Sequence, residues 1–308
     1  MVKTKTVAIV TGHGGHLGTG HIQRAVSIAW YLNSMPGVKS FILAPEPSGL
    51  FNEEILQLFV SPEIISPDII IRDMRDSTVE EMRDLQRISK VLALDDIGEG
   101  RNVADWCVDL LPNPVLGSGN DFDFQQRHFI FGYNFISSIS EQQDINTGRT
   151  IDVMLYCGND PDREYLEKLL GLLPGNITCA VAAGEKSYIV KGGKRQVLRN
   201  SSYGDLLFSS KVVVTHFGLL VYEALLSGAG VITINPSEYH SELAQYIAEK
   251  SDVKNLGTRD SFSEKLFRET LDTMLNADTI ARVNPEEMYR QVVQNLERFS
   301  NYMLNLIE

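Results

Sequence analysis

The feature that most constrains this chain is an apolar run that leads directly into a glycine-rich loop and then into a helical pattern. Residues 7–11, Val-Ala-Ile-Val-Thr, are apolar and rich in β-branched side chains, which is typical of a strand buried on both faces. Five glycines follow within residues 12–20. Apolar residues then recur at helical spacing, at Ile22, Ala25, Val26, Ala29 and Leu32. The order predicts a strand, a loop and a helix that packs through its apolar side.

Similar apolar runs recur along the whole chain and predict an α/β fold with parallel sheets. They lie at residues 40–43, 69–71, 91–94 and 129–131, and again at 153–156, 179–182, 212–215 and 231–235. A length of 308 residues favours two domains, because a single hydrophobic core stops growing near that size. Residues 137–149 are polar and lack a sustained period. We therefore expect domains at residues 1–145 and 146–308, with the boundary near Asn146.

The end of the chain predicts one long helix. Asn284 is placed to cap it, Pro285 suits its first position and Glu287 takes the capping-box place. Its apolar side carries Met288, Val292, Leu296, Phe299, Met303 and Leu306. We expect this helix to pack through its apolar side, and one option is that it packs back onto the first domain.

Composition restricts the classes of partner. The chain is 43% hydrophobic and 22% charged, as in a compact globular protein, and its formal net charge of −12 is unlike that of proteins binding nucleic acid or anionic lipid. Three cysteines without CxxC spacing and an N-terminus without a signal pattern favour a reduced, cytoplasmic protein. No apolar stretch approaches the roughly 20 residues that cross a bilayer, so no membrane insertion is expected.

The positions of the histidines point to a ligand site. Five of the six follow the carboxyl end of a predicted strand, at His13, His16, His21, His216 and His240. Ligands of open parallel sheets bind at that edge, so the pattern predicts a cleft between the two domains. The alternative is that histidine is simply common in loops.

The first loop admits several ligands. Its glycines permit close approach of the backbone, and the following helix offers N–H groups to a phosphate or a sugar hydroxyl. A G-x-G-x-x-G dinucleotide fingerprint does not fit, because Leu17 or Gln23 stands where the last glycine belongs. Zinc bound by His13, His16 and His21 is disfavoured, since no carboxylate or cysteine lies beside them in the loop. No metal and no cofactor are expected.

Five short motifs together resemble one family. Residues 18–24, Gly-Thr-Gly-His-Ile-Gln-Arg, resemble the I-G-x-G-H-x-x-R element of the nucleotide-sugar hydrolases of pseudaminic acid biosynthesis and the related spore-coat polysaccharide proteins. The apolar strand ending in Asp95 and Asp96 is similar to another element of that family. Further matches are Phe-Ile-Phe-Gly-Tyr at 129–133, the Gly-Asn-Asp-Pro turn at 158–161 and Val-Tyr-Glu-Ala-Leu at 221–225.

The resemblance implies a glycosyltransferase-B architecture of two Rossmann-like domains facing a cleft, shared with the peptidoglycan N-acetylglucosaminyltransferase. It implies that His21 is the catalytic base. Sugar-binding residues would be Gly14, Gly15, His16, Gly18, Gly20, Arg24, Asp95 and Asp96. Nucleotide-binding residues would be Gly158, Asn159, His216, Phe217, Gly218, Leu219, Glu223, Tyr239 and His240. The residues themselves leave two alternatives open, that His21 caps its own helix and that Glu223 forms an internal salt bridge.

We therefore expect a UDP-sugar hydrolase or glycosyltransferase of surface polysaccharide or glycan biosynthesis, acting by inversion at the anomeric carbon. A carbohydrate acceptor is one expected partner. The chain departs from the family in its first loop and at residues 237–240, so the pseudaminic substrate is not assumed. Asp121 and Asp123 match the metal-binding D-x-D of the other glycosyltransferase fold, but they more simply face solvent. The alternatives are a non-catalytic nucleotide-sugar-binding protein and an NAD-dependent dehydrogenase.

Overall fold

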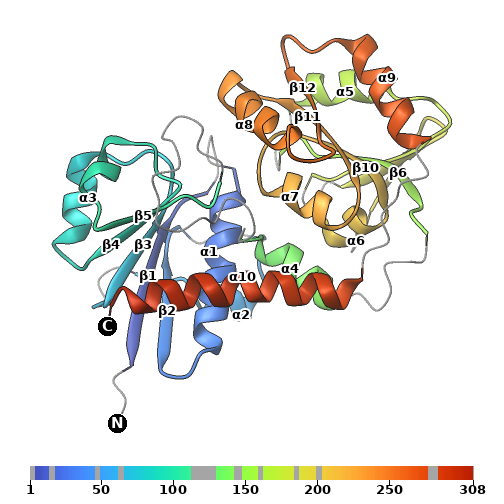
Figure 1. The fold of residues 1–308 in the computed structure, drawn as a ribbon. Coiled ribbons are helices and arrows are strands. Elements are labelled where there is room, and N and C mark those ends of the chain that lie inside the picture. The colour runs from blue at the N-terminus through green and yellow to red at the C-terminus, as the bar shows by residue number, and fades with distance from the viewer. Residues whose placement is uncertain are drawn as a thin grey trace. The chain divides into compact units, whose positions relative to one another are not determined.

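The computed structural model describes residues 4–13, 18–45, 49–61, 66–111, 130–141, 148–158, 162–183, 187–198, 203–276 and 284–307 (Figure 1). The chain divides into two compact units. Unit 1 comprises Met1–Tyr133 together with Gln291–Glu308, and unit 2 comprises Asn134–Arg290. Each unit contains its own sheet, as the sequence predicts for an α/β protein.

Unit 1 is built on a five-stranded sheet in the order β2-β1-β3-β4-β5. Every pairing in it is parallel. The strands are β1 (Lys5–Thr11), β2 (Val38–Leu43), β3 (Ile69–Asp73), β4 (Val91–Leu94) and β5 (Trp106–Val108). All residues of β3 and β4 are buried. The continuous apolar runs therefore reflect a sheet covered on both faces.

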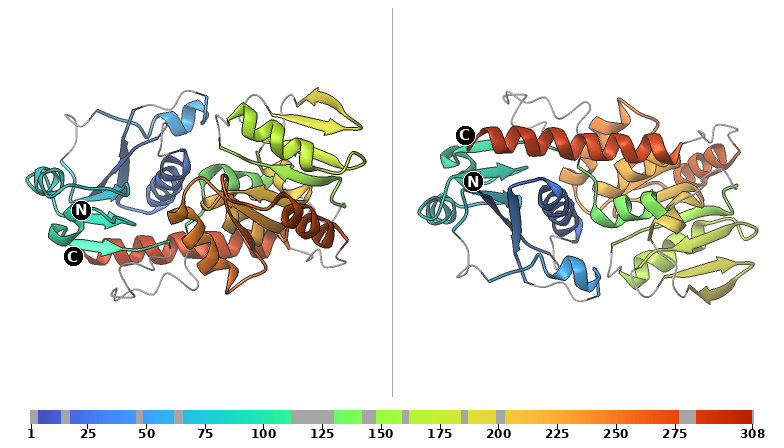
Figure 2. Two further views of the ribbon diagram at one scale, coloured as in Figure 1. Left: turned by 90° about the horizontal axis from the view of Figure 1, so that it is seen from above. Right: turned by 90° about the horizontal axis from the view of Figure 1, so that it is seen from below.

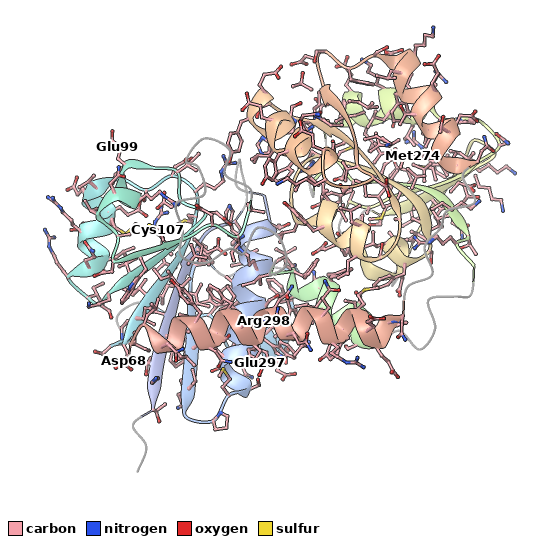
Figure 3. The ribbon with its side chains drawn as sticks, viewed as in Figure 1. Asp68, Glu99, Cys107, Met274, Glu297 and Arg298 are labelled. Carbon is pink, nitrogen blue, oxygen red and sulfur yellow. The ribbon has the colours of Figure 1, made fainter. Side chains whose placement is uncertain are left out.

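Helices cover the two faces of this sheet. They are α1 (Gly20–Ser34), α2 (Glu53–Leu56), α3 (Val79–Gln86), the 3₁₀ helix η3 (Glu99–Val103) and the later part of α10 (Pro285–Asn305). The strand order moves outward from β1 in opposite directions through α1 and α3, so right-handed crossovers place these two helices on opposite faces. Met82 of α3 packs on Ala8 and Ile70. Cys107 of β5 lies near η3, where its Sγ contacts the carbonyl of Arg101 at 3.3 Å (Figure 3).

Unit 2 contains a seven-stranded sheet in the order β12-β11-β10-β6-β7-β8-β9. The strands are β6 (Ile151–Leu155), β7 (Thr178–Val181), β8 (Tyr188–Lys191), β9 (Lys194–Val197), β10 (Ser210–Thr215), β11 (Gly230–Asn235) and β12 (Lys254–Thr258). Only the pairings that involve β8 and β9 are antiparallel in the described sheet. The helices of the second half are α4 (Tyr133–Glu141), α5 (Arg163–Leu172), α6 (Tyr203–Phe208), α7 (Leu219–Leu226), α8 (Glu238–Ala248) and α9 (Glu264–Leu275).

The core of unit 2 explains how its sheet is fixed. Alternate residues of the central strands, such as Val153, Val212 and Ile232, pack on Leu169 of α5 and Phe267 of α9. Alternation places every second side chain of a strand on one face. The carboxyl ends of the parallel strands consequently meet at one edge of a rigid layer.

The final helix agrees with the sequence prediction except at Leu306, which follows the helix and is half-buried. Asn284 Oδ1 accepts from the amide of Glu286 at 2.9 Å, and α10 begins at Pro285. Met288, Val292, Leu296, Phe299 and Met303 are buried. Figure 2 shows α10 as one uninterrupted helix, which spans 21 residues, and Glu297 and Arg298 mark its later part in Figure 3.

Several elements differ from the sequence prediction. Ile130 and Phe131 are buried but form no strand, and Phe129 lies outside the described residues. β5, β12 and the β8–β9 hairpin were not predicted, because β5 and β8 have apolar runs of only three residues and β9 and β12 are mostly polar. The units divide between Tyr133 and Asn134, before the expected boundary near Asn146. Packing explains this position, since Phe135 of α4 contacts Phe208 of α6 with ring centroids 5.8 Å apart.

Within the described ranges, no helix has both the length and the apolar character needed to cross a membrane.

We predict that Gly204→Ala destabilises unit 2 by about 1–3 kcal/mol, because overpacked cores force neighbouring atoms to move. A Cβ on Gly204 of α6 would lie 2.0 Å from the Cβ of Ser138. Gly171→Ala in α5 is the control, since its Cβ would meet nothing within 4 Å and alanine is the better helix former. Urea denaturation followed by circular dichroism measures both. Equal stability of the two variants would contradict the prediction.

Candidate functional site

The carboxyl edge of the unit 1 sheet gathers polar side chains from three neighbouring strands. Thr11 ends β1, Asp73 ends β3 and Asp95 follows β4. The Thr11 Oγ1 hydroxyl donates to the backbone carbonyl of Asp73 at 3.0 Å. The helix α1 begins after the loop that leaves β1, so its first turn can reach the same edge.

His21 contacts a buried carboxylate at this edge. Its Nδ1 lies 2.8 Å from Asp73 Oδ1, and the two side chains are 11% and 0% exposed. The contact fixes the imidazole ring through Nδ1. The second ring nitrogen, Nε2, takes no part in this contact. An imidazole held by a carboxylate in this way is suited to accept a proton at Nε2. The structure thus gives His21 a tertiary partner, which the helix-capping alternative does not require.

Arg24 binds the other side of the same carboxylate. Its Nε donates to Asp73 Oδ2 at 2.9 Å and its Nη2 to Asp73 Oδ1 at 2.5 Å, while Nη1 donates to Asp95 Oδ2 at 2.5 Å. Burial by itself raises the pKa of Asp73, but Arg24 and then His21 outweigh it and hold that pKa well below its usual range. Burial likewise opposes the charge of Arg24, yet its two carboxylate partners raise its pKa. Asp73 is therefore ionised at neutral pH.

The adjacent aspartates both turn toward protein groups. Asp95 Oδ1 accepts from the amides of Leu110 and Leu111 at 2.6 and 2.8 Å. Asp96 pairs with Arg72 at 3.2 Å and also accepts from the amides of Ser77 and Gly98. Arg24, Asp95 and Asp96 are thus buried in ion pairs. This placement favours a positioning role, and their contact with a sugar stays a prediction.

The glycine-rich loop is described in part. Gly18 has φ +65°, which glycine adopts readily, and Gly20 is the first residue of α1. Gly14, Gly15, His16, Asn159, Asp121 and Asp123 lie outside the described residues. His13 Nε2 contacts the carbonyl oxygen of Pro45 at 2.9 Å. Across the described part of the chain, no three His, Cys, Asp or Glu side chains gather as metal ligands.

The carboxyl edge of the unit 2 sheet holds the turn between β10 and α7. Asn235 Oδ1, at the end of β11, accepts from the amide of Phe217 at 2.8 Å, and its Nδ2 donates to Asn255 Oδ1 at 3.0 Å. The Phe217 amide is therefore occupied. Gly218 caps α7, and the first-turn amides of Leu219 and Leu220 have no acceptor within the helix. These amides can face an anion.

His216 and Arg259 line a narrow cavity beside this turn, whose free space is too small to hold a water molecule. The His216 ring stacks on Tyr156, with centroids 6.1 Å apart. The guanidinium of Arg259, which follows β12, lies 4.6 Å from the centroid of the Tyr165 ring. Among the described residues, His216 Nδ1 and Arg259 Nε are buried without a hydrogen-bond partner. Buried polar atoms usually have a hydrogen-bond partner, so these two atoms are open to one.

The charge state of His216 follows from its surroundings. Burial, then Arg259 and His240, lower the pKa of His216 to about 4. The imidazole is therefore neutral at neutral pH. Arg259 supplies positive charge on this side of the edge, and within the described ranges it forms no ion pair with a carboxylate.

The remaining predicted nucleotide residues lie around the same strand ends. Glu223 of α7 is buried, and its Oε2 accepts from the Tyr203 hydroxyl at 2.6 Å. Burial and then Glu223 raise the pKa of that hydroxyl. His240 Nδ1 contacts Ser237 Oγ at 2.8 Å, and its ring meets Tyr239 edge to face. Gly158, after β6, has φ +100°, a conformation that L side chains rarely adopt. Their contact with a nucleotide stays a prediction.

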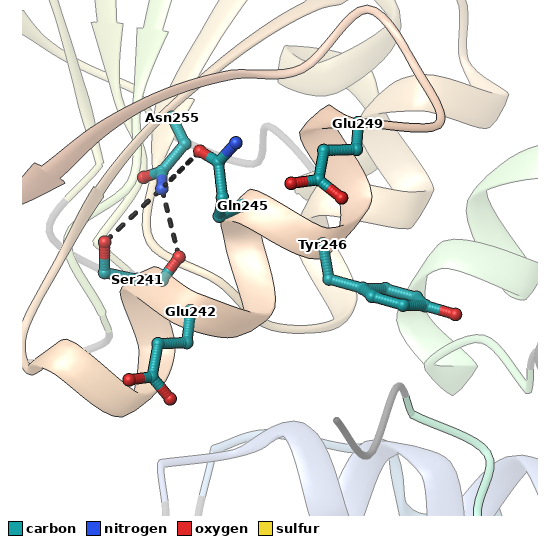
Figure 4. Close-up of a pocket in the computed structure, with 6 residues that line it drawn as sticks. All are labelled: Ser241, Glu242, Gln245, Tyr246, Glu249 and Asn255. Atoms are coloured by element: carbon teal, nitrogen blue, oxygen red, sulfur yellow. Dashed lines mark hydrogen bonds between the residues drawn. The ribbon is translucent and has the colours of Figure 1, made fainter. Parts of the chain in front are cut away.

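A larger hollow on α8 and β12 is less suited to an anion. It has an accessible volume of about 400 Å³, and Figure 4 shows Asn255 and Gln245 on one side with Glu242 and Glu249 nearby. Asn255 Nδ2 donates to the Ser241 carbonyl at 3.0 Å, so the amide is already used. The carboxylates of Glu242 and Glu249, which also line this hollow, repel phosphate.

No protein-family model and no curated protein matches the sequence. Among solved structures, 105 chains are similar in fold. The glycotransferase of kitacinnamycin superposes with a TM-score of 0.61 at 11% identity, over 99% of this chain and 100% of that chain. The UDP-GlcNAc 2-epimerase from Neisseria meningitidis bound to UDP-GlcNAc gives 0.59 at 13% identity, over 97% and 100%. The spinosyn rhamnosyltransferase SpnG with thymidine diphosphate gives 0.55 at 12%, over 97% and 100%.

These likenesses show the fold. The chain has two Rossmann-like domains of the glycosyltransferase-B type, so the predicted fold class is confirmed. At this identity the neighbours do not distinguish a hydrolase from a transferase or an epimerase. The narrower resemblance to the pseudaminic hydrolases stays a prediction.

Three residues at these edges were missed by the sequence analysis. Asp73 and Asn235 end strands, and Arg259 directly follows one. A signal existed, because Asp73 lies two residues after the apolar run at 69–71, as the histidines follow their own strands. Arg259 follows the polar strand β12 and had no such signal.

We predict that His216 makes the chain less stable in acid. The unfolded histidine binds a proton near its ordinary pKa of about 6.5, whereas the folded one does so only near 4. The stabilising neutral form is thus fully present above about pH 6.5 and is lost as pH falls toward 4. Replacing His216 by Gln should reduce the fall in unfolding free energy between pH 7 and 4.5 by up to ~3 kcal/mol, measured by urea denaturation. Parallel pH profiles of wild type and variant would contradict this.

Proposed function

We propose that the protein acts on nucleotide-sugars, with unit 2 binding the nucleotide and His21 of unit 1 serving as the base. The observation that carries the proposal is the His21–Asp73 contact at the ligand edge of a Rossmann-like sheet. The neighbours named for glycosyl transfer and for UDP-GlcNAc 2-epimerisation support the substrate class.

In the proposed reaction, a hydroxyl oxygen of water or of a carbohydrate attacks the anomeric carbon. His21 Nε2 takes the proton from that hydroxyl, while Asp73 holds Nδ1 and stabilises the resulting imidazolium. The bond between the anomeric carbon and the diphosphate oxygen breaks, and both its electrons leave with the nucleoside diphosphate. A single displacement of this kind inverts the configuration of the sugar.

The leaving diphosphate needs positive partners. The first-turn amides of α7 offer the partial positive end of the helix, and Arg259 offers a full charge near His216, in the turn before that helix. Glu223, held by Tyr203, is proposed as the acceptor for the ribose hydroxyls. Uracil is the favoured nucleobase, because the S. aureus MnaA structure contains UDP and the N. meningitidis epimerase structure contains UDP-GlcNAc. The SpnG structure contains thymidine diphosphate instead.

A second candidate is epimerisation of a UDP-sugar, which the likeness to UDP-GlcNAc 2-epimerases favours. The products separate the candidates. Incubation with UDP-GlcNAc, with and without a carbohydrate acceptor, followed by NMR would show free sugar and UDP for a hydrolase. It would show a glycosylated acceptor for a transferase, and a second UDP-sugar for an epimerase.

We predict that UDP binds the protein and that Arg259→Gln weakens this binding by about 10- to 100-fold, the equivalent of a lost hydrogen bond to a charged group. Isothermal titration calorimetry measures it. Arg268→Gln is the matched control, because Arg268 of α9 donates to the carbonyl of Leu172 and lies away from the cavity lining. Unchanged affinity in Arg259→Gln would remove Arg259 from the site. Absence of binding to UDP and dTDP would refute the proposal.

We predict that His21→Ala lowers kcat at least 100-fold, as expected when a general base is removed, while UDP affinity stays within a few-fold. Turnover is measured as release of nucleoside diphosphate from a panel of UDP-sugars, with and without acceptors. NMR of the fresh product should show the anomer opposite to that of the donor. Full activity in His21→Ala, or retention of configuration, would refute the mechanism. An inert wild type would favour a binding protein.

A further inference from the structure

We propose that Asp95 is a positioning residue for the reaction, acting on His21 through Arg24 and Asp73. It supplies the surplus negative charge that balances His21 once that residue has taken the proton. This inference rests on the role of His21 given above, but its structural part can be measured without turnover.

The charges of the buried cluster carry the first step of the argument. Arg24 contributes one positive charge, while Asp73 and Asp95 contribute one negative charge each, and their side chains are 2%, 0% and 5% exposed. If Asp73 were the only carboxylate, its negative charge and the positive charge of Arg24 would cancel. Asp95 makes the sum −1, so the cluster becomes neutral when His21 is protonated. Solvent screening is weak at such burial, so this surplus charge acts on the imidazole.

Geometry carries the second step. The planar guanidinium uses Nε and Nη2 on Asp73 and Nη1 on Asp95, so its orientation is fixed at both ends. Asp73 Oδ1 is shared between Arg24 Nη2 at 2.5 Å and His21 Nδ1 at 2.8 Å. Any rotation of Arg24 would therefore move the oxygen that holds His21.

The backbone at Asp95 supports a specialised role. Its φ of 50° lies in the left-handed region that non-glycine residues seldom occupy. The conformation is held because its amide donates to the Val108 carbonyl at 3.0 Å and its Oδ1 accepts from the Leu110 amide. Strain of this kind persists where surrounding contacts determine it, and it gathers at functional sites.

Neighbouring charged residues belong to separate pairs. Asp96 binds Arg72, which also reaches Glu81, and Asp109 binds Arg101 through contacts of 2.6 and 2.8 Å. Asp109 is buried next to Leu110 but has no contact with Arg24. Because it follows β5, the strand next to β4, it offers a control for the loss of a buried carboxylate at a neighbouring strand end.

The test compares Asp95→Asn with Asp109→Asn in the full-length protein. Asparagine keeps the shape of Asp95 and tolerates a positive φ, but it removes the charge. We expect Asp95→Asn to lower kcat about 10- to 100-fold, a part of what a general base contributes, with KM and UDP affinity within a few-fold. Asp109→Asn should lose stability but keep its kcat. Equal kcat in wild type and Asp95→Asn, or equal losses in the two variants, would overturn the inference.

A second readout does not depend on turnover. The ¹⁵N shifts of the His21 imidazole, assigned with His21→Gln, report its protonated fraction at one fixed pH. That fraction should be lower in Asp95→Asn than in wild type, and it should be retained in Asp95→Glu, which keeps the charge. An unchanged fraction in Asp95→Asn would overturn the charge argument. Should Asp95→Asn not fold, a reduced fraction in Asp95→Glu would overturn it. An inert wild type with the expected shifts would refute the proposed function alone.

Discussion

The buried carboxylate of Asp73 is the group on which the arrangement of unit 1 depends. A charge removed from water requires compensation by partners with good geometry. Asp73 meets this requirement with Arg24 and His21, both carried by α1. The first turn of α1 is therefore tied to the end of β3, two elements far apart in the sequence. The packing of α1 through Ile22, Ala25 and Val26 supplies the apolar burial that makes this ion pair rigid.

In unit 2, neutral groups rather than charged ones hold the turn at the carboxyl edge of the sheet. Asn235 holds the turn before α7 by accepting from Phe217, and its own amide is anchored by Asn255. Since asparagine carries no charge, the turn is fixed without a carboxylate that would repel a phosphate. His216 is kept neutral by its surroundings, and Arg259 has no carboxylate partner among the described residues. The edge thus retains unpaired donors, whereas the edge of unit 1 holds a satisfied network of charges.

The sequence predicted most of the central strands because their signal is local. Val7 to Thr11 and Val212 to Thr215 are apolar runs buried on both faces, and such runs have few other folds available. β12 and the β8–β9 hairpin escaped prediction because their pairing depends on the strands beside them. The site was predicted in the same uneven way. His21 follows a recognisable motif, but its link to Asp73 spans 52 residues of sequence and requires the sheet order. Arg259 shows no pattern before folding brings it beside His216.

The net charge of −12 bears on the ligand in a way that composition alone conceals. An acidic surface disfavours long polyanions, which contact many side chains at once. A nucleoside diphosphate is small enough to be held at a single strand edge, where local donors outweigh the distant surface charge because solvent screens the latter within about 10 Å. Helix amides add partial positive charge without adding any formal charge to the composition. An acidic chain can therefore bind a compact anion, provided that few carboxylates face the site. Arg259 and the first turn of α7 meet that condition, whereas the hollow lined by Glu242 and Glu249 does not.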